Sequence, residues 1–369
     1  MQLAGEALNE LNVDQSRPID PFPIIDQLGL KLAFQPLVGL LGAILNPTAE
    51  LANPGVLIST ARGAGAQRYT AAHEIGHWFM HREQLASDPA ADGVAEIYGG
   101  RSTAPREREA QLFASFFLMP LPLVGSVARN YGVRRNGDVT PAQLYSIARD
   151  LRVSYEAAAR QLANLRFITR GVRDNLLRTQ PAQVKKVLGH GRPPTHSGAD
   201  VWLVDQSGDR TIDAYVGDDI VLSLAENPTT GFRWMTREAY EHALEASNAS
   251  TAPPAFGDGV ELALPAGETA AGLDVLRGEE LVRPVADRFL RDSFDADADA
   301  DADAVGHGGE RVVTLVADRK GVWTTDLVYA SPFEPASAAD ELALTVDVLS
   351  GPEQWAKDMR IASVRGGVQ

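Results

Sequence analysis

The spacing of apolar residues changes part-way along the chain. The first half contains apolar runs typical of helices, over residues 68–81, 105–120, 140–151 and 153–165. Beyond about residue 200, apolar residues occupy every second position, as in Ile220, Leu222 and Leu224. The pattern predicts a two-domain protein, with an α+β first half and an all-β second half.

Residues 68–81 contain the motif His73-Glu74-Ile-Gly-His77. Histidines four positions apart lie on one face of a helix, so both rings can reach one Zn²⁺ ion. Glu74 then lies beside the metal and can take a proton from water. The alternative is a pair of histidines that only pack inside a helix, and a third ligand would argue against it.

Helix 105–120, which begins at Pro105 and ends at Pro120, supplies that third ligand. We predict that the third ligand is Glu107, which lies in the first turn of this helix, where a carboxylate is favourable. Glu109 is the rival, but it points about 200° away around the helix, so only one of the two can face the metal. His81 lies about 12 Å along the axis from His73, so we expect a capping or supporting role for it.

The neighbours of these residues add two expectations. Gln111, one turn after Glu107, could hydrogen-bond a ligand. The apolar positions of this helix predict a buried stripe, made of Leu112, Phe113, Phe116 and Phe117.

These segments together resemble the ImmA/IrrE family of zinc metallopeptidases. The family pattern Arg-Phe/Tyr-Thr-x-Ala-His-Glu-x-x-His matches residues 68–77. A second pattern, Glu-x-x-Ala-Asn-x-Phe-Ala followed by Leu-Met-Pro, matches 107–120 with Gln111 in place of Asn. Residues 24–34 and 153–165 resemble the opening helix and strand and the closing helix of the family. The resemblance implies a gluzincin-type peptidase over residues 1–175 that cleaves a regulatory protein, such as a transcriptional repressor.

The implied mechanism has Zn²⁺ on His73, His77 and Glu107, with Glu74 as the proton carrier. The oxyanion donor stays open among Arg68, Tyr69 and Tyr98. An apolar segment at 37–45 predicts a strand paired with residues 56–59. We expect this strand to lie at the edge of the cleft, where it could hold an extended substrate backbone by β-addition.

The second half predicts a β-sandwich with three loops of distinct composition. Strands are expected near 219–224, 311–317, 323–329 and 342–348. The loops between strands are Asn227-Pro228-Thr229-Thr230-Gly231, a glycine-rich loop at 306–309 that includes Gly308 and Gly309, and Ser331-Pro332-Phe333.

The three loops resemble those of the chagasin family of cysteine-protease inhibitors. The family presents Asn-Pro-Thr-Thr-Gly, a glycine-rich loop and Arg-Pro-Trp/Phe at one end of an immunoglobulin-like sandwich. Ser331 replaces the arginine here. The resemblance implies a protein partner, either a papain-like cysteine protease or another protein docked through the same loops. Two alternatives stay open. The protein could be an inhibitor or adaptor whose peptidase half is only a scaffold, or the sandwich could regulate the peptidase of its own chain.

We place the domain boundaries by composition. The peptidase-like domain covers 1–175, a linker rich in proline and glycine covers 176–199, and the sandwich covers 200–352 with an acidic insertion at about 240–304. A tail follows at 353–369. The Asp-Ala run at 295–303 lacks the glycine and closing glutamate of a calcium loop, so we expect a solvated segment there.

Charge and composition narrow the choice of partners and compartment. The net charge of −15 over 369 residues repels nucleic-acid phosphates, so we expect no direct nucleic-acid binding. The chain has no cysteine, which excludes disulfides and thiol ligands. Because no signal-like or membrane-spanning apolar run stands out, we expect a cytoplasmic protein that binds no membrane.

Overall fold

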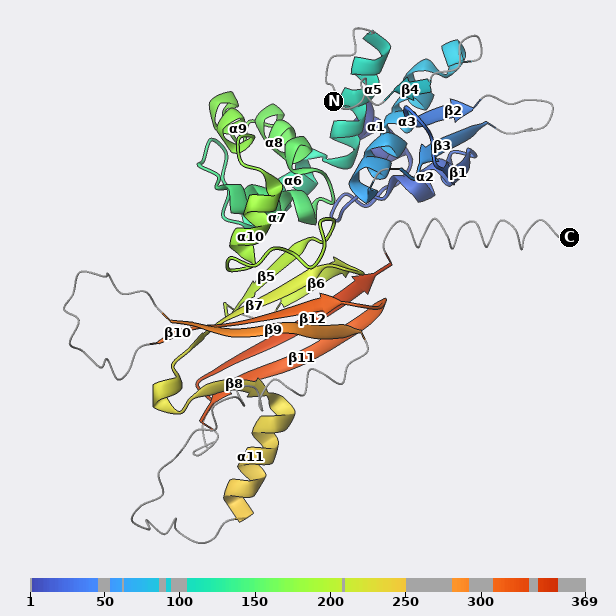
Figure 1. Cartoon of the computed structure of the whole chain (residues 1–369). Coiled ribbons are helices and arrows are strands. Elements are labelled where there is room, and N and C mark those ends of the chain that lie inside the picture. Colours follow the sequence, from blue (N-terminus) through green and yellow to red (C-terminus); the bar gives the residue numbers. More distant parts are fainter. Residues whose placement is uncertain are drawn as a thin grey trace, which may run out of the picture. The chain divides into compact units, whose positions relative to one another are not determined.

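The computed structural model (Figure 1) describes residues 2–45, 54–61, 63–85, 91–93, 105–207, 210–249, 281–291, 308–331 and 338–350. The chain forms two compact units, with Met1–Val184 in the first and Lys185–Ser350 in the second. The acidic run at 295–303 lies outside the described residues, as do Tyr98, Pro332 and Phe333.

The first unit is rich in helices and contains one small sheet. Its elements are α1 (Gln2–Glu10), α2 (Pro21–Gln27), β1 (Lys31–Gln35), β2 (Leu40–Leu45), β3 (Gly55–Ser59), α3 (Ala64–Leu85), β4 (Ala91–Gly93), α5 (Pro105–Leu118), α6 (Leu121–Asn130), α7 (Pro141–Asp150), α8 (Tyr155–Asn164) and α9 (Arg170–Leu176). The helices predicted at 140–151 and 153–165 are confirmed as α7 and α8, and the side chains of Thr140 and Ser154 cap their first turns.

The sheet has the order β1-β3-β2-β4. The predicted pairing of β2 with β3 is confirmed and is antiparallel. The addition of a substrate strand to β2, which we expected, is not supported, because β4 already pairs with the other side of β2 at Leu40, Gly42 and Ala43. Only three residues form β4, which is too short a segment for periodicity to reveal.

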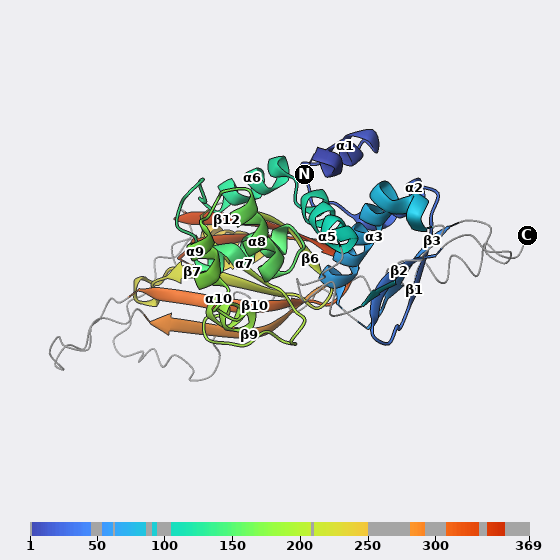
Figure 2. The same cartoon turned by 90° about the horizontal axis from the view of Figure 1, so that it is seen from above.

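Helix α3 packs against both the sheet and helix α5, which lies beside it in Figure 2. Both contacts need a glycine. A β-carbon added at Gly42 of β2 would lie 2.4 Å from Cγ2 of Thr70, and one added at Gly76 would lie 3.0 Å from Cδ1 of Phe113. The two glycines therefore allow α3 to approach β2 and α5 closely.

The predicted linker at 176–199 is partly helical, because α10 (Pro181–Leu188) lies inside it. Pro181 occupies the first helical position, and Gly191 follows the helix with φ +85°. The prolines and glycines that indicated a linker thus mark the two ends of a helix. The division between the units falls within this helix.

The second unit is a sandwich of two four-stranded sheets, β5-β7-β10-β9 and β6-β12-β11-β8. The strands are β5 (Val201–Asp205), β6 (Arg210–Tyr215), β7 (Asp219–Glu226), β8 (Arg233–Thr236), β9 (Val282–Arg291), β10 (Gly309–Ala317), β11 (Gly321–Ala330) and β12 (Asp340–Leu349). Alternate residues of both sheets form one core, including Ile220, Leu222, Leu224, Trp234, Trp323, Leu327, Leu344 and Val346. Helix α11 (Arg237–Ala249) follows β8 directly (Figure 1).

Nearly all the described residues within the insertion predicted at about 240–304 form regular secondary structure. Helix α11 covers its beginning, and β9 pairs antiparallel along β10. The sequence of β9 is mixed because it is an edge strand, paired on one side only, and it tolerates Pro284 and several charges.

Among the described residues, no single helix is long and apolar enough for a membrane span; α5 and α6 satisfy that test only as a pair bent by 52°.

Candidate metal centre

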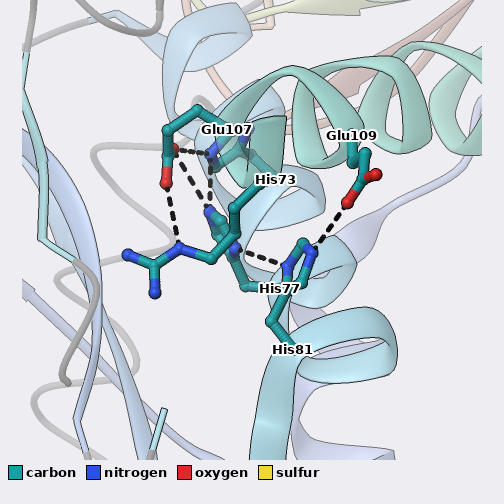
Figure 3. A network of polar contacts seen from close by, with 6 residues as sticks. His73, His77, His81, Glu107 and Glu109 are labelled. Carbon is teal, nitrogen blue, oxygen red and sulfur yellow. Dashed lines mark hydrogen bonds and ion pairs between the residues drawn. The ribbon is translucent and has the colours of Figure 1, made fainter. Parts of the chain in front are cut away.

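Helices α3 and α5 bring together three side chains that could hold a metal ion, as Figure 3 shows. His73 and His77 lie one turn apart on α3, and Glu107 reaches them from the first turn of α5. One donor atom from each lies within 4.8 Å of the others, and all three residues are buried. The structure thus unites the three predicted ligands.

The distances between the donor atoms fit a small divalent cation. Nε2 of His73 lies 3.1 Å from Nε2 of His77, and Oε2 of Glu107 lies 3.2 Å and 3.3 Å from these nitrogens. Ligands about 2.0–2.1 Å from a tetrahedral zinc ion lie about 3.3–3.4 Å apart. The three atoms therefore form one face of a tetrahedron of suitable size and leave its fourth corner to another ligand.

The second oxygen of Glu107 has a different neighbour. Oε1 lies 3.6 Å from Nε of Arg106, so the carboxylate is oriented with Oε2 toward the imidazoles. Arg106 was not among the predicted site residues. Its position next to Glu107 gives no signal, because adjacent residues on a helix usually point in different directions.

Glu74 faces the sheet rather than α5. Its side chain is fully buried, and a β-carbon at Gly42 would lie 2.9 Å from its Oε1. Glu74 is the residue after His73, so its side chain leaves α3 in a different direction. Its carboxylate lies between α3 and β2. This space exists because Gly42 has no side chain. A glycine inside an apolar strand often marks a close approach of this kind, so Gly42 was the feature of the sequence that could have predicted it.

Glu109 and His81 form a second contact beside the first. Nε2 of His81 lies 3.0 Å from Oε2 of Glu109, and Nδ1 of His81 lies 3.1 Å from Nδ1 of His77. Glu107, and not Glu109, is therefore the acidic residue within the metal-binding cluster. His81 contacts a predicted ligand from behind, as the sequence analysis expected.

Two candidates for an oxyanion donor are engaged elsewhere. The hydroxyl of Tyr69 donates to the backbone carbonyl of Gln111 at 3.1 Å, and the buried guanidinium of Arg68 donates to the carbonyl of Ile19. Tyr98 lies outside the described residues. No donor is assigned to this role.

A cavity of about 310 Å³ lies one helical turn from the cluster, between α3, α5 and α8. Its lining includes Tyr69, Arg108, Gln111, Leu112, Ser115 and Gln161. The expected burial of Leu112 is wrong, since this side chain is 48% exposed and faces the cavity. The apolar stripe of α5 is narrower than predicted because α8 leaves this gap.

Two of the three expected loops lie at one end of the second unit. Residues Pro228–Thr230 form a short 3₁₀ helix, and Gly231 follows it with φ +77°. Gly309 pairs with Glu226, the residue before Asn227. A cavity of about 370 Å³ is lined by residues of both loops, including Asn227, Gly308 and Gly309.

Tyr329 of β11 anchors this end of the unit. Its hydroxyl accepts a hydrogen bond from the backbone N–H of Asn227 at 3.0 Å, and its ring stacks on Trp234 at 5.4 Å. Ser331, which begins the third loop, follows β11 directly. Tyr329 was assigned only to the strand pattern, because a single tyrosine in a strand does not reveal a long-range contact.

Two family models match the chain. Residues 26–163 match the IrrE N-terminal-like domain, a peptidase family, and residues 213–348 match the chagasin family of peptidase inhibitors. The first of these segments is thus similar to IrrE-like peptidases, and the second is similar to chagasin-family inhibitors.

Solved structures of inhibitors also match the chain. A cysteine protease inhibitor from Entamoeba histolytica, EhICP2, is 14% identical and covers 42% of this chain and 100% of its own, with a TM-score of 0.26. PbICP-C in complex with falcipain-2 is 13% identical, with 42% and 96% coverage and a TM-score of 0.23. The Leishmania mexicana inhibitor ICP is 20% identical, with 43% and 96% coverage and a TM-score of 0.22. No curated protein matches.

The cluster of the IrrE-like domain has the donor chemistry of a catalytic metal site. Two neutral imidazoles and one carboxylate suit zinc and leave one coordination position for water or substrate. The chagasin-family domain instead presents turns and glycines at one end, which suits recognition of another protein.

Proposed function

We propose that the IrrE-like domain is a zinc-dependent endopeptidase. The observation that carries this proposal is the convergence of His73, His77 and Glu107 at 3.1–3.3 Å, with Glu74 next to them in the helix. A structural pair of histidines needs neither a shared carboxylate oxygen nor a neighbouring buried glutamate.

Each residue has a distinct role in this proposal. His73, His77 and Glu107 hold the metal, and Arg106 keeps the carboxylate of Glu107 oriented. Zinc bound there would supply Lewis-acid polarisation and a nucleophile at neutral pH. Glu74 takes the proton of the attacking water and delivers it to the leaving amine. The buried space between α3 and β2 holds this carboxylate in place.

We propose a regulatory protein, such as a transcriptional repressor, as the substrate. The support is the resemblance of residues 68–120 to the ImmA/IrrE peptidases. A single cleavage would be enough to inactivate such a target, so general proteolysis of unfolded proteins is not part of the proposal.

The test compares Glu74→Gln with Glu6→Gln, which makes the same chemical change at an exposed position of α1. Both variants and the wild type are loaded with zinc and incubated with repressor proteins encoded near this chain. Glu74→Gln should lose cleavage by about 100- to 10,000-fold while it retains zinc, because only proton transfer is removed. Equal cleavage by Glu74→Gln and Glu6→Gln would overturn the role of Glu74.

We propose a second function for the chagasin-family domain, which is binding of a papain-like cysteine protease through its three loops. The family match supports it, and so does the cavity shared by Asn227 with Gly308 and Gly309. Ser331 in place of the family arginine leaves docking of a different protein as the alternative within this proposal.

Papain inhibition tests this second function. The full-length Glu74→Gln variant is titrated into papain, so that cleavage by the peptidase domain does not interfere. Inhibition should weaken when Thr230→Ala removes the hydroxyl that donates to the carbonyl of Asn227 at 2.7 Å. Papain activity that is unchanged at every concentration would favour docking of another protein.

A further inference from the structure

A buried histidine lies behind the proposed metal ligands and takes no part in the mechanism above. His81 is only 6% exposed, and it lies between His77 and Glu109 in Figure 3. We infer that His81 and Glu109 are positioning residues that fix the tautomer and the orientation of His77. This inference rests on the proposed metal site, because it assumes that Nε2 of His77 is a ligand atom.

The proton positions follow from the distances, one atom at a time. A ring nitrogen that binds a metal carries no proton, so the single proton of neutral His77 lies on Nδ1. This Nδ1 is 3.1 Å from Nδ1 of His81, which must therefore accept the hydrogen bond. The proton of His81 then lies on Nε2, 3.0 Å from Oε2 of Glu109, and an ionised carboxylate accepts it.

Every other arrangement of neutral rings leaves a mismatch. If His81 carried its proton on Nδ1, two N–H groups would face each other at 3.1 Å, and its Nε2 lone pair would face the carboxylate of Glu109. The two hydrogen bonds that link His77, His81 and Glu109 can therefore both form in only one donor-to-acceptor direction, from His77 toward Glu109. This chain of hydrogen bonds starts in the buried cluster and ends at a carboxylate whose side chain is 60% exposed.

The spacing of residues along α3 and α5 brings these hydrogen-bonding side chains together. His73, His77 and His81 follow each other at intervals of one turn on α3. On α5, Glu107 supplies a carboxylate to the cluster, and Glu109, two positions later, supplies one to His81. The same helix pair thus makes the metal site and the support behind it.

Support of this kind raises the basicity of the ligand nitrogen and stops rotation of the ring. Loss of a supporting partner typically weakens metal binding by about 10- to 100-fold. A residue that only filled space would have no such effect when it is replaced by an apolar side chain of similar size.

The test uses His81→Leu and His81→Asn, two side chains with the same number of heavy atoms and the same branching at Cγ. Asparagine can place its carbonyl oxygen where Nδ1 of His81 lies, so it keeps the acceptor for His77, whereas leucine removes it. Zinc affinity of the full-length protein is measured by competition with a chelator. We expect the Leu variant to bind about 10- to 100-fold more weakly and the Asn variant to stay within a few-fold of the wild type.

A spectroscopic readout accompanies the affinity. In ¹⁵N-edited proton NMR of the zinc-loaded protein, the Nδ1–H of His77 should be protected from exchange in the wild type and in His81→Asn. It should exchange rapidly in His81→Leu. Circular dichroism of each variant shows whether the first unit remains folded.

Two results separate the possible failures. If wild type and both His81 variants bind zinc equally tightly, the positioning role is overturned while the metal site stands. If the wild type binds no zinc, the proposed function and this inference fail together. A Leu variant that is weakened no more than the Asn variant would show that the hydrogen bond to His77 is unimportant, and would also overturn the inference.

Discussion

Gly42 determines how the carboxylate of Glu74 fits against the sheet. A β-carbon at this position would lie 2.4 Å from Cγ2 of Thr70, 2.9 Å from Oε1 of Glu74 and 3.0 Å from the carbonyl oxygen of Leu57. Distances below 3.0 Å require one of these groups to move, and the backbone of β3 cannot move easily. A single methyl group would therefore disturb both the stability of the first unit and the position of Glu74.

We predict that Gly42→Ala destabilises the first unit by about 1–3 kcal/mol, the usual cost of overpacking a core. Thr70→Ser removes the atom in closest contact, so the double variant should regain part of the lost stability. Urea unfolding of the full-length protein checks both. A Gly42→Ala variant as stable as the wild type, or a double variant with no recovery, would contradict this account of Gly42.

At the same scale, the sequence predicts motif residues well and their surroundings poorly. The pair His73 and His77 follows from helix geometry, which also predicts that only one of Glu107 and Glu109 can face the histidines; the contacts in the structure identify it as Glu107. The contact of Arg106 with Glu107 does not follow, because helix periodicity gives no signal for a contact between adjacent residues. The exposure of Leu112 does not follow either, because it depends on how α3 and α8, which are distant in sequence, pack around α5.

The packing of helix α3 against helix α5 determines the geometry of the candidate site, because the separation of the two helices sets the distance between the histidines and Glu107. Gly76 lies between His73 and His77 in the chain, and a β-carbon added to it would lie 3.0 Å from Cδ1 of Phe113 of α5. Gly65 of the same helix has open space around it. The two glycines therefore offer a matched pair of substitutions in one helix.

We predict that Gly76→Ala lowers zinc affinity and destabilises the first unit by about 1–3 kcal/mol, because the new methyl group pushes α5 away. Gly65→Ala should be neutral or slightly stabilising, since alanine is the better helix former. Thermal unfolding and zinc titration of both variants check this. Equal behaviour of the two would show that the helix spacing does not depend on Gly76.

Asp218 joins three strands of the second unit. Its carboxylate accepts hydrogen bonds from the backbone N–H of Asp200 at 2.9 Å, from Nε1 of Trp202 at 3.0 Å and from the backbone N–H of Tyr215 at 2.9 Å. These donors belong to β5, to the residue before it and to the end of β6, and β7 begins directly after Asp218. Burial, and then the charge of Asp200, raise the pKa of Asp218 above its ordinary value.

A raised pKa means that the folded state binds the proton of Asp218 more tightly than the unfolded state does. The contribution of this proton to the free energy of unfolding is complete below the pKa of Asp218 in the unfolded state, about 4. It is lost as the pH rises through the pKa of Asp218 in the folded state. We predict that the unfolding free energy of the wild type falls, relative to Asp218→Asn, as the pH rises from about 4. Urea unfolding of both proteins at several pH values checks this. A difference that grows with pH would contradict the sign.

Elements with clear end signals were predicted best. The capped helices α7 and α8 and the alternating strand β12 agree with the sequence analysis, because caps and alternation are local. Helix α10 and strand β9 were missed. The first is bounded by residues that also mark linkers, and the second is a charged edge strand whose pattern resembles that of a loop.

The chain forms two compact units, each with its own candidate site. The proposed metal cluster lies entirely in Met1–Val184, and the loops that resemble an inhibitor lie in Lys185–Ser350. The change from helical to alternating periodicity near residue 200 predicted this division. The exact boundary was harder to predict, because α10 continues across it.

We predict that metal removal affects only one of the two units. Zinc at about 100 times its Kd should stabilise the first unit by about 2.7 kcal/mol. EDTA should therefore lower the unfolding temperature of the first unit and leave that of the second unchanged. Calorimetry of the full-length protein checks this, with Glu107→Ala as a control whose first transition should not respond to EDTA. A shift in the second transition alone would contradict the location of the metal.

The most direct test of the central claim is the zinc stoichiometry of the purified, reconstituted chain, measured by elemental analysis. We predict one zinc ion per chain for the wild type and for Glu6→Gln, and almost none for His77→Ala and Glu107→Ala after the same dialysis. A wild type that retains no zinc, or a Glu107→Ala variant that retains as much as the wild type, would contradict the proposed metal centre.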